Sequence, residues 1–346
     1  MSRRRQLRLL AALGFLGAAI AARPACAQAP AEFYAGRTID LYIGFSPGGA
    51  YDIYARQLAR FMGNHLPGHP TLVPRTMAGA GGLTLANFLY NVAPKDGTAF
   101  GTFSRGLVTE PLLGTGARFD TAKFFWLGSV AAETSLCAAW STSPVKSWDD
   151  MLHKDFVVGG TGPGADTDIF APMLKNMFGA KLKLITGYPG GNELNAALEK
   201  GEIDGRCGWS WSAIKSTSMA WVTDRRIRML VQLGLAKSPD LPDVPWVMDF
   251  ARNERDRQIL KLILARLVVA WPFVAPPGLP EAQKAALRRA FDDTMHDPGF
   301  LAETERSGLN VSPVGGAEID ALIAELYRMP SDVVDAARVA AGLAAR

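Results

Sequence analysis

The chain has 346 residues, of which 48% are apolar, 20% charged and 9% aromatic, a composition that excludes an intrinsically disordered protein. This length is typical of two domains and buries enough surface to fold without disulfides or metal ions. Five of the 37 basic residues lie within residues 1–27, so the rest of the chain has 32 basic against 33 acidic residues, a net charge of −1. Nucleic acid binding therefore has no electrostatic support.

Residues 1–27 predict a cleaved export signal. A basic segment, Arg3–Arg8, precedes an apolar run from Leu9 to Ala22, and Ala25-Cys26-Ala27 has the small-x-small pattern of a cleavage site. The apolar run is shorter than the roughly 20 residues that span a bilayer, which argues against the alternative of an uncleaved anchor. The start is also similar to a twin-arginine signal, and the export route stays open. We expect a soluble exported protein that begins near Gln28.

The cysteines leave the presence of a disulfide open, whereas the histidines argue against a metal site. Cys137 and Cys207 lie 70 positions apart, which suits a disulfide in an exported protein and suits two buried thiols equally. The four histidines are scattered, with no acid or cysteine at ligand spacing, so we expect no metal site.

Strand-like and helix-like stretches alternate along the rest of the chain, which predicts an α/β fold. Expected strands cover 39–45, 71–73, 99–103, 156–158, 183–186, 203–207 and 226–232. Expected helices cover 52–64, 87–90, 168–178, 193–200, the stretch that starts at 280, 297–308 and 317–329. The apolar stretch 259–274 contains Lys261, Arg266 and Pro272, so it is not a membrane span.

Glycine-rich loops connect three of these strand–helix pairs. They lie at 46–49, 79–82 and 159–164. A loop of this kind exposes backbone N–H groups at the positive end of a helix, where an anion binds, and glycine lets the ligand approach the backbone. Ligands of open α/β sheets bind outside the carboxyl ends of the strands, which is where these loops lie.

Seven loose motifs occur in an order that resembles a known family. They are Tyr34–Ile39 with Gly44–Arg56, then Gly79–Gly82, Ala93–Thr98, Gly160–Gly164, Gly201–Asp204, Ser238–Pro245 and Val274–Gly278. Together they span residues 33–330 and resemble the substrate-binding proteins of tripartite tricarboxylate transporters, the TctC or Bug-type periplasmic receptors. The chain departs from the family pattern in three places: Thr76–Ala78 replaces Asn-Arg-Pro, Ala165 replaces a serine, and Gly208–Ser212 has more aromatic residues than is usual there.

The resemblance implies an α/β periplasmic-binding-protein (type II-like) fold, with two α/β lobes joined by crossing strands and a ligand cleft between them. Lobe 1 would comprise 28–134 plus 266–346, and lobe 2 would comprise 135–265. Such a protein acts in the periplasm as a monomer without cofactor. It captures a small organic acid, such as a di- or tricarboxylate, and delivers it to the membrane permease subunits of the transporter.

The resemblance and the loop positions together give a candidate ligand site. In the family, the two glycine loops hold a ligand carboxylate largely through backbone groups and water. Arg105 is a candidate for a two-pronged carboxylate contact, with a solvated loop residue as the alternative. Trp209 and Trp211 would face the same side of a strand and wall the cleft, with core packing as the alternative. The candidate residues are Ser46, Gly48, Gly49, Ala50, Tyr51, Asp52, Gly81, Arg105, Thr161, Gly162, Gly164, Ala165, Tyr188 and Trp209.

Two acids beside the second-lobe loop raise a question about the ligand. Asp166 and Asp168 lie where an anion would be repelled. Either they are acids at a helix N-terminus, as is common, or they face the cleft and the ligand carries an amine or several hydroxyls.

Catalysis has little support. Gly208-x-Ser210-x-Ser212 lacks the final glycine of a nucleophile elbow, and no glycine loop has the spacing of a dinucleotide fingerprint. We therefore expect a binding protein and not an enzyme. A receptor that signals to a membrane sensor is the alternative, and an exported hydrolase is the weaker one.

Overall fold

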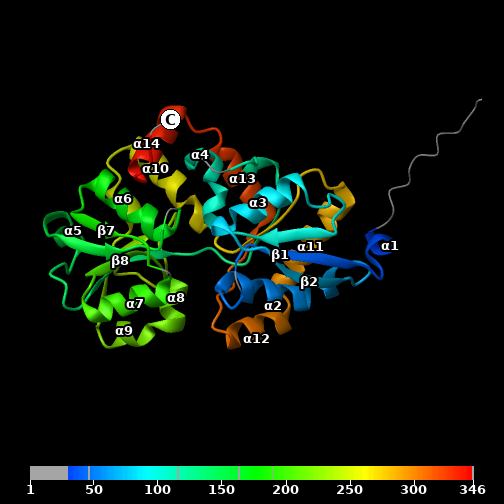
Figure 1. The fold of residues 1–346 in the computed structure, drawn as a ribbon, viewed down its shortest axis with the longest axis horizontal. Helices are drawn as coiled ribbons and strands as arrows, with labels where there is room; N and C mark the ends of the chain where they lie inside the picture. The colour runs from blue at the N-terminus through cyan, green and yellow to red at the C-terminus, as the bar shows by residue number, and fades with distance from the viewer. Residues whose placement is uncertain (1–29, 46, 115–116, 163, 189, 345–346) are drawn as a thin grey trace, which may run out of the picture.

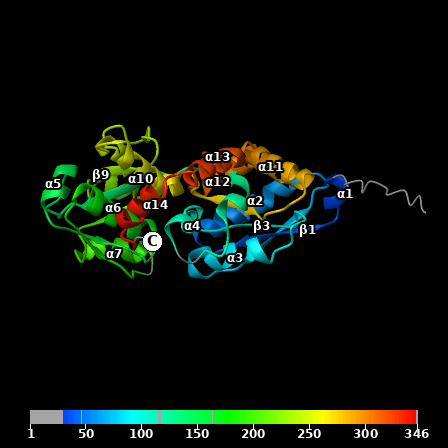
Figure 2. The same cartoon turned by 90° about the horizontal axis from the view of Figure 1, so that it is seen from above.

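The computed structural model describes residues 30–344 except 46, 115–116, 163 and 189. The predicted export signal and the candidate site residue Ser46 lie outside the described residues. The strands form two separate sheets, each within its own lobe, and the lobes lie side by side along the long axis of the molecule (Figures 1 and 2). The predicted α/β fold with two lobes is confirmed.

Lobe 1 is built on a six-stranded sheet in the order β11-β4-β10-β3-β1-β2. Its strands are β1 (Thr38–Ile43), β2 (Thr71–Thr76), β3 (Ala99–Thr102), β4 (Phe125–Ser129), β10 (Pro272–Ala275) and β11 (Val314–Gly315). β1 pairs in parallel with β2 and β3, whereas β10 is antiparallel to β3 and β4.

Helices bury both faces of this sheet. On one face, Ile39, Leu41 and Ile43 of β1 pack with apolar side chains of α2 (Ala50–His65), α11 (Glu281–Met295) and α12 (Pro298–Arg306). On the other face, α3 (Leu83–Asn91) and α13 (Gly316–Leu326) pack around Trp126 and Val274. The loop after β3 reaches the second lobe, where Arg105 pairs with Asp166, and Phe45 after β1 lines a cavity between the lobes.

Lobe 2 is built on a five-stranded sheet in the order β7-β6-β8-β5-β9. Its strands are β5 (Ser135–Trp140), β6 (Phe156–Gly159), β7 (Leu182–Ile185), β8 (Gly205–Ser210) and β9 (Ile227–Leu233). Alternate residues of β5 supply two cores: Cys137 and Ala139 face one, and Leu136 and Ala138 face the other.

The remaining helices cover these faces or connect them. α5 (Trp148–His153), α6 (Asp166–Phe178), α10 (Glu254–Leu264) and α14 (Ser331–Ala340) pack on the face of Cys137. α7 (Gly191–Lys200), α8 (Trp211–Thr217) and α9 (Met219–Thr223) cover the opposite face. Shorter helices are α1 (Pro30–Tyr34), α4 (Glu110–Leu113), η1 (Ala80–Gly82), η2 (Arg105–Val108), η3 (Thr121–Lys123), η4 (Val247–Phe250) and η5 (Ala265–Leu267).

Two of the segments that carry the chain between the lobes run against each other. Residues 130–134 join β4 to β5, and residues 265–271 lead from α10 to β10. The Val130 N–H donates to the Trp271 carbonyl at 3.1 Å, and the Glu133 N–H donates to the Leu267 carbonyl at 2.8 Å. These two crossing segments, called the hinge segments, link the lobes.

The strands divide between the sheets along the predicted lobe boundaries, but the C-terminal helix does not follow them. Although 266–346 is predicted to belong to lobe 1, α14 packs against α10 and α6 in the core of lobe 2 (Figure 1). Buried Arg338 ties α14 to α4 by donating to the Leu113 carbonyl. The last helix thus returns from one lobe to the other.

Several elements differ from the sequence-based expectations. β4 and β5 were not predicted, because both are buried on two faces and have no period-two polarity. The apolar stretch 259–274 divides into the end of α10, the turn η5 and the start of β10. Within the described part of the chain, no helix combines the length and the apolar character needed to cross a membrane.

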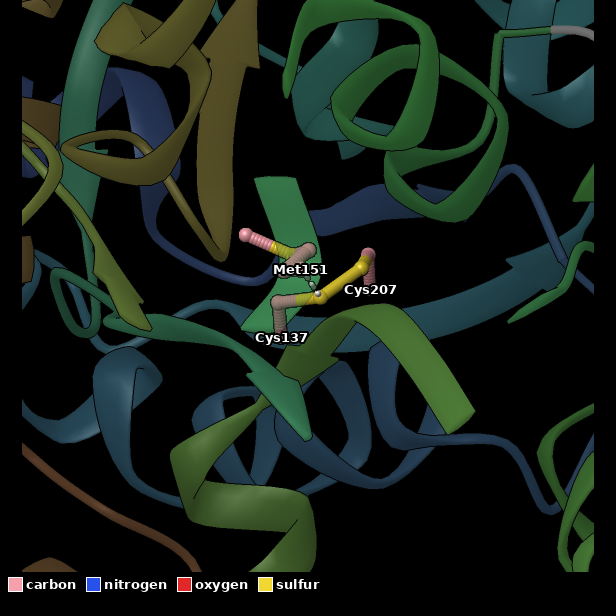
Figure 3. Close-up of a disulfide and its surroundings, with 3 residues drawn as sticks. All are labelled: Cys137, Met151 and Cys207. Atoms are coloured by element: carbon pink, nitrogen blue, oxygen red, sulfur yellow. Dashed lines mark hydrogen bonds between the residues drawn. A yellow bond between two sulfur atoms is a disulfide. The ribbon is translucent and has the colours of Figure 1, made fainter. Parts of the chain in front are cut away.

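The structure resolves the open question about the two cysteines. Cys137 and Cys207 face each other in register on antiparallel β5 and β8, and a disulfide joins them (Figure 3). The Met151 sulfur of α5 lies 3.9 Å from the Cys137 sulfur. All three side chains are buried within the lobe 2 core.

Candidate functional site

A cavity of about 250 Å³ lies between the two lobes. Lobe 1 contributes the ends of β1 and β3, the start of α2 and the hinge, whereas lobe 2 contributes the loop before α6 and the end of β8. The lining residues of lobe 1 are Phe45, Tyr51, Ser104, Arg105 and Trp271. Those of lobe 2 are Thr161, Gly164, Ala165, Asp166, Thr167, Arg206, Gly208, Ser210 and Ala213.

Aromatic rings form the lobe 1 wall of this cavity. The Tyr51 ring stacks on Phe45, with centroids 4.3 Å apart, and meets Trp271 edge-on at 4.8 Å. The Tyr51 hydroxyl donates to the Ala270 carbonyl at 3.3 Å and accepts the Arg105 N–H at 2.9 Å. Burial raises the pKa of Tyr51, so its phenol stays neutral at physiological pH. Tyr51 thereby links the hinge to the loop that carries Arg105.

An ion-pair cluster bridges the lobes beside this wall. Arg105, at the start of η2, pairs with the carboxylate of Asp166, which opens α6, and donates to the Ser210 hydroxyl at 3.1 Å. Arg266, from the hinge, donates to the Gly164 carbonyl at 2.9 Å and lies 3.4 Å from Asp166. Burial would lower the pKa of Arg105, but Asp166 and other nearby groups raise it, so the guanidinium stays charged. Asp166 therefore faces the cleft as a counterion and does not merely begin a helix.

In both glycine loops, backbone N–H groups donate hydrogen bonds to side chains of the helix that follows the loop. In lobe 1, the Gly48 N–H donates to Asp52 at 2.9 Å, and Asp52 also accepts from Arg56 at 2.8 Å. In lobe 2, the Gly162 N–H donates to Asp168 at 2.9 Å. The Thr161 N–H donates to the Thr167 hydroxyl at 3.1 Å. These three donors are engaged within the chain.

The structure gathers some of the predicted site residues and separates others. Tyr51, Arg105, Thr161, Gly164 and Ala165 line the cavity. The other described candidates do not. Gly48, Gly49 and Ala50 are exposed around the start of α2, Asp52 is buried as a cap, Gly81 lies in η1, Gly162 donates to Asp168, and Tyr188 lies beside Gly159.

The two tryptophans lie outside the cavity lining. β8 ends at Ser210 and Trp211 opens α8, so the two residues do not alternate on one strand. Both are buried in the core formed by α7 and α8, with 1% and 8% exposure. Trp211 donates from its indole nitrogen to Asp240 at 2.9 Å. Core packing accounts for Trp209, which stacks under Arg206 and meets Trp221.

Sequence reasoning missed several lining residues, of which Arg206 is the most informative. It is the one charged residue of β8, a strand that lies inside the sheet between β6 and β5. A single arginine within an otherwise uncharged central strand is unusual, because buried charges are costly, and that was the available signal. Ser104, Ser210 and Trp271 gave no signal, since their grouping depends on the packing of the lobes.

Comparison with known proteins finds likeness at the level of structure. No protein-family model and no curated protein sequence matches the chain. A TctC solute-binding protein from Polaromonas aligns over 85% of this chain and 96% of its own, with a TM-score of 0.66 and 17% identity. The periplasmic binding protein BugD aligns over 90% and 100%, with a TM-score of 0.64 and 20% identity.

A third similar structure was solved with a ligand. MatC from Rhodopseudomonas palustris, described with bound malate, aligns over 86% of this chain and 99% of its own, with a TM-score of 0.62 and 19% identity. At these identities the comparison establishes the fold. The chain has the fold of the TctC and Bug-type periplasmic binding proteins.

Proposed function

We propose that this protein is a periplasmic receptor that captures a small organic carboxylate between its lobes and delivers it to a membrane permease of the tripartite tricarboxylate type. The observation that carries the proposal is the inter-lobe cavity, in which three charged side chains, Arg105, Asp166 and Arg206, converge. A volume of about 250 Å³ is below the usual range for drug-sized ligands and suits an acid of a few carbons. The malate described in MatC, a protein of the same fold, supports this ligand class.

Binding is proposed to proceed by hinge closure. Each lobe has its own core, and the crossing segments 130–134 and 265–271 are short and adjacent. A rotation at these segments would separate the walls of the cavity without disturbing either sheet. Tyr51, Arg105, Thr161, Gly164 and Ala165 are the predicted residues that we retain in the ligand site. The protein is proposed to act as a monomer, without cofactor and without making or breaking a covalent bond.

Thermal unfolding of residues 28–346 with a ligand panel tests this proposal. The panel contains C3–C6 dicarboxylates, malate, citrate, aromatic acids and acidic amino acids, with the corresponding amides as uncharged controls. A ligand at 100 times its Kd stabilises the folded state by about 2.7 kcal/mol, a shift of several degrees in Tm. We expect one class of acid to raise Tm and its amide to have no effect. If no acid in the panel raises Tm, and mass spectrometry shows that no ligand copurified with the protein, the carboxylate assignment is contradicted.

A further inference from the structure

Around the cleft, Arg105 and Arg266 have an acidic partner, whereas Arg206 has none among the described residues. Asp166 is shared by Arg105 and Arg266. The second acid, Asp168, accepts from Gly162 N–H, Thr167 and Thr186, all of which are neutral. Among the residues that the structure describes, no carboxylate lies within ion-pair distance of Arg206.

The surroundings of Arg206 also leave much of its hydrogen-bonding capacity unused. Its Nη1 donates to the Asn195 side chain at 3.3 Å, and the guanidinium lies 4.9 Å from the centre of the Trp209 ring. Its buried Nε–H has no hydrogen-bond partner within the described structure. A Cβ at Gly191 would lie 3.3 Å from Nη2, so the first turn of α7 lies close to the guanidinium.

Arg206 is partly buried, and its guanidinium lacks a counterion within the described structure. Desolvation lowers the pKa of Arg206 to about 10, so the group is still protonated at neutral pH. Burying a charge without a partner is costly, whereas a planar guanidinium binds a carboxylate through two parallel hydrogen bonds. The N–H groups of Gly48, Thr161 and Gly162 are engaged by the chain's own side chains, so these three donors are not free for an anion.

We propose that Arg206 is the specificity-determining residue of the cleft, and that its guanidinium binds a carboxylate of the ligand directly. This inference rests on the proposed function and adds the residue that recognises the negative charge of the ligand. The Arg105–Asp166 pair lines the same cavity and also joins the lobes. A cavity with one unpaired cation selects an acid over its amide, and Trp209 holds the guanidinium plane in place.

The test compares three arginine variants by isothermal titration calorimetry, with the carboxylates of the melting panel and their amides as probes. Arg206→Met removes the charge at similar length. Arg206→Lys keeps the charge but lacks the planar guanidinium that binds a carboxylate through two parallel hydrogen bonds. Arg228→Met, at an exposed arginine of β9 in the same sheet, is the matched control. For the best-binding carboxylate we expect Arg206→Met to raise Kd about 10- to 150-fold and Arg206→Lys to raise it less, with Arg228→Met unchanged.

A second readout separates ligand binding from a structural role. If Arg206 serves the ligand, the preference of the wild-type protein for the acid over its amide disappears in Arg206→Met, while the Tm of the ligand-free protein stays the same or rises. Unchanged affinity in Arg206→Met would overturn the inference and leave the proposed function standing. A ligand-free Tm that falls in both Arg206 variants, with the acid preference intact in Arg206→Met, would also overturn it. Failure of the wild-type protein to bind any carboxylate would overturn the inference together with the proposed function.

Discussion

At the scale of single residues, three acidic side chains determine which hydrogen-bond donors around the cleft are already engaged. Asp52 and Asp168 each hold an N–H of a glycine loop, and Asp166 pairs with Arg105 across the lobes. The backbone donors that glycine loops offer to anions are thus already satisfied at Gly48 and Gly162. Under the proposed function, the arginines that line the cleft offer a carboxylate ligand additional, charged donors.

Asp166→Asn should destabilise the protein, because it leaves Arg105 and Arg266 in a largely buried site without a carboxylate. Their side chains are 12% and 4% exposed, and loss of one member of a buried ion pair costs about 3–5 kcal/mol. Urea unfolding measures the change. Asp149→Asn, at a side chain that is 84% exposed, is the control and should change the free energy of unfolding by less than about 0.5 kcal/mol. Equal effects of the two variants would show that the inter-lobe pair does not stabilise the fold.

Asp52→Asn should have an effect that depends on pH. Burial would raise the pKa of Asp52, but hydrogen bonds from Arg56 and Gly48 outweigh it and lower the pKa below its ordinary value. The charged form therefore stabilises the fold above the unfolded-state pKa of about 3.9, and this stabilisation is lost as pH falls through the folded-state pKa. We expect urea unfolding to show a loss of about 1–2 kcal/mol at pH 7 that shrinks toward pH 3. A difference that stays constant between these pH values would contradict the assignment.

At the scale of elements, a bulge in β8 brings the first turn of α6 to the cavity. The register of β8 against β5 shifts next to Gly208, whose φ is +90°. A Cβ there would lie 2.6 Å from backbone atoms of Asp166 and Thr167. Only glycine allows the strand and the helix start to approach so closely, and this approach places Asp166 opposite Arg105.

Gly208→Ala should therefore destabilise the protein by backbone strain and by a clash with α6. Gly179→Ala is a matched control, because Gly179 has a similar φ of +77° but open space around its Cβ position. Each substitution should cost about 1–3 kcal/mol in strain. The clash should add about 1–3 kcal/mol at position 208 alone. Chemical denaturation of both variants measures the difference, and similar losses would mean that α6 moves aside without penalty.

At the scale of the whole molecule, the chain passes between the lobes in three places. Two are the hinge segments, and the third is the connection from α13 to α14. Because α14 packs on α6 and α10, the end of the chain stabilises the lobe whose strands lie in the middle of the sequence. Hinge closure has to accommodate this third connection.

Ala337→Asp should loosen lobe 2 selectively. Ala337 is fully buried between α14 and its neighbours, whereas Val339 on the same helix is 52% exposed. A buried, unpaired carboxylate is costly, so amide hydrogen exchange in α6 and α10 should become faster while α2 and α11 in lobe 1 keep their protection. Val339→Asp is the control and should leave both lobes unchanged. Faster exchange spread evenly over both lobes would show that they unfold as one unit.

Much of the fold could be predicted from local patterns. Helices with an apolar face, such as 193–200 and 317–329, correspond to α7 and α13 with shifts of a few residues. Strands that are buried on both faces are harder to predict from sequence. β4 and β5 were missed because nothing in their composition distinguishes them from a buried helix. For the site, residues beside glycine loops were found when the loop itself reaches the cleft, as at Thr161 and Gly164. Arg206 was missed because it lies within a strand.

The sequence by itself determined the α/β class, the two-lobe organisation and the resemblance to TctC and Bug-type receptors, because these depend on periodicity, turn residues and the order of short motifs. Tertiary structure alone decided which charges meet. Arg105, Asp166 and Arg266 are 61 to 161 positions apart, and their grouping follows from the docking of one lobe on the other. Arg206 has neutral neighbours within lobe 2, Asn195 and Trp209, and these too come from different elements. Whether a charged residue is a counterion, a cap or a ligand contact depends on neighbours that the local sequence does not contain.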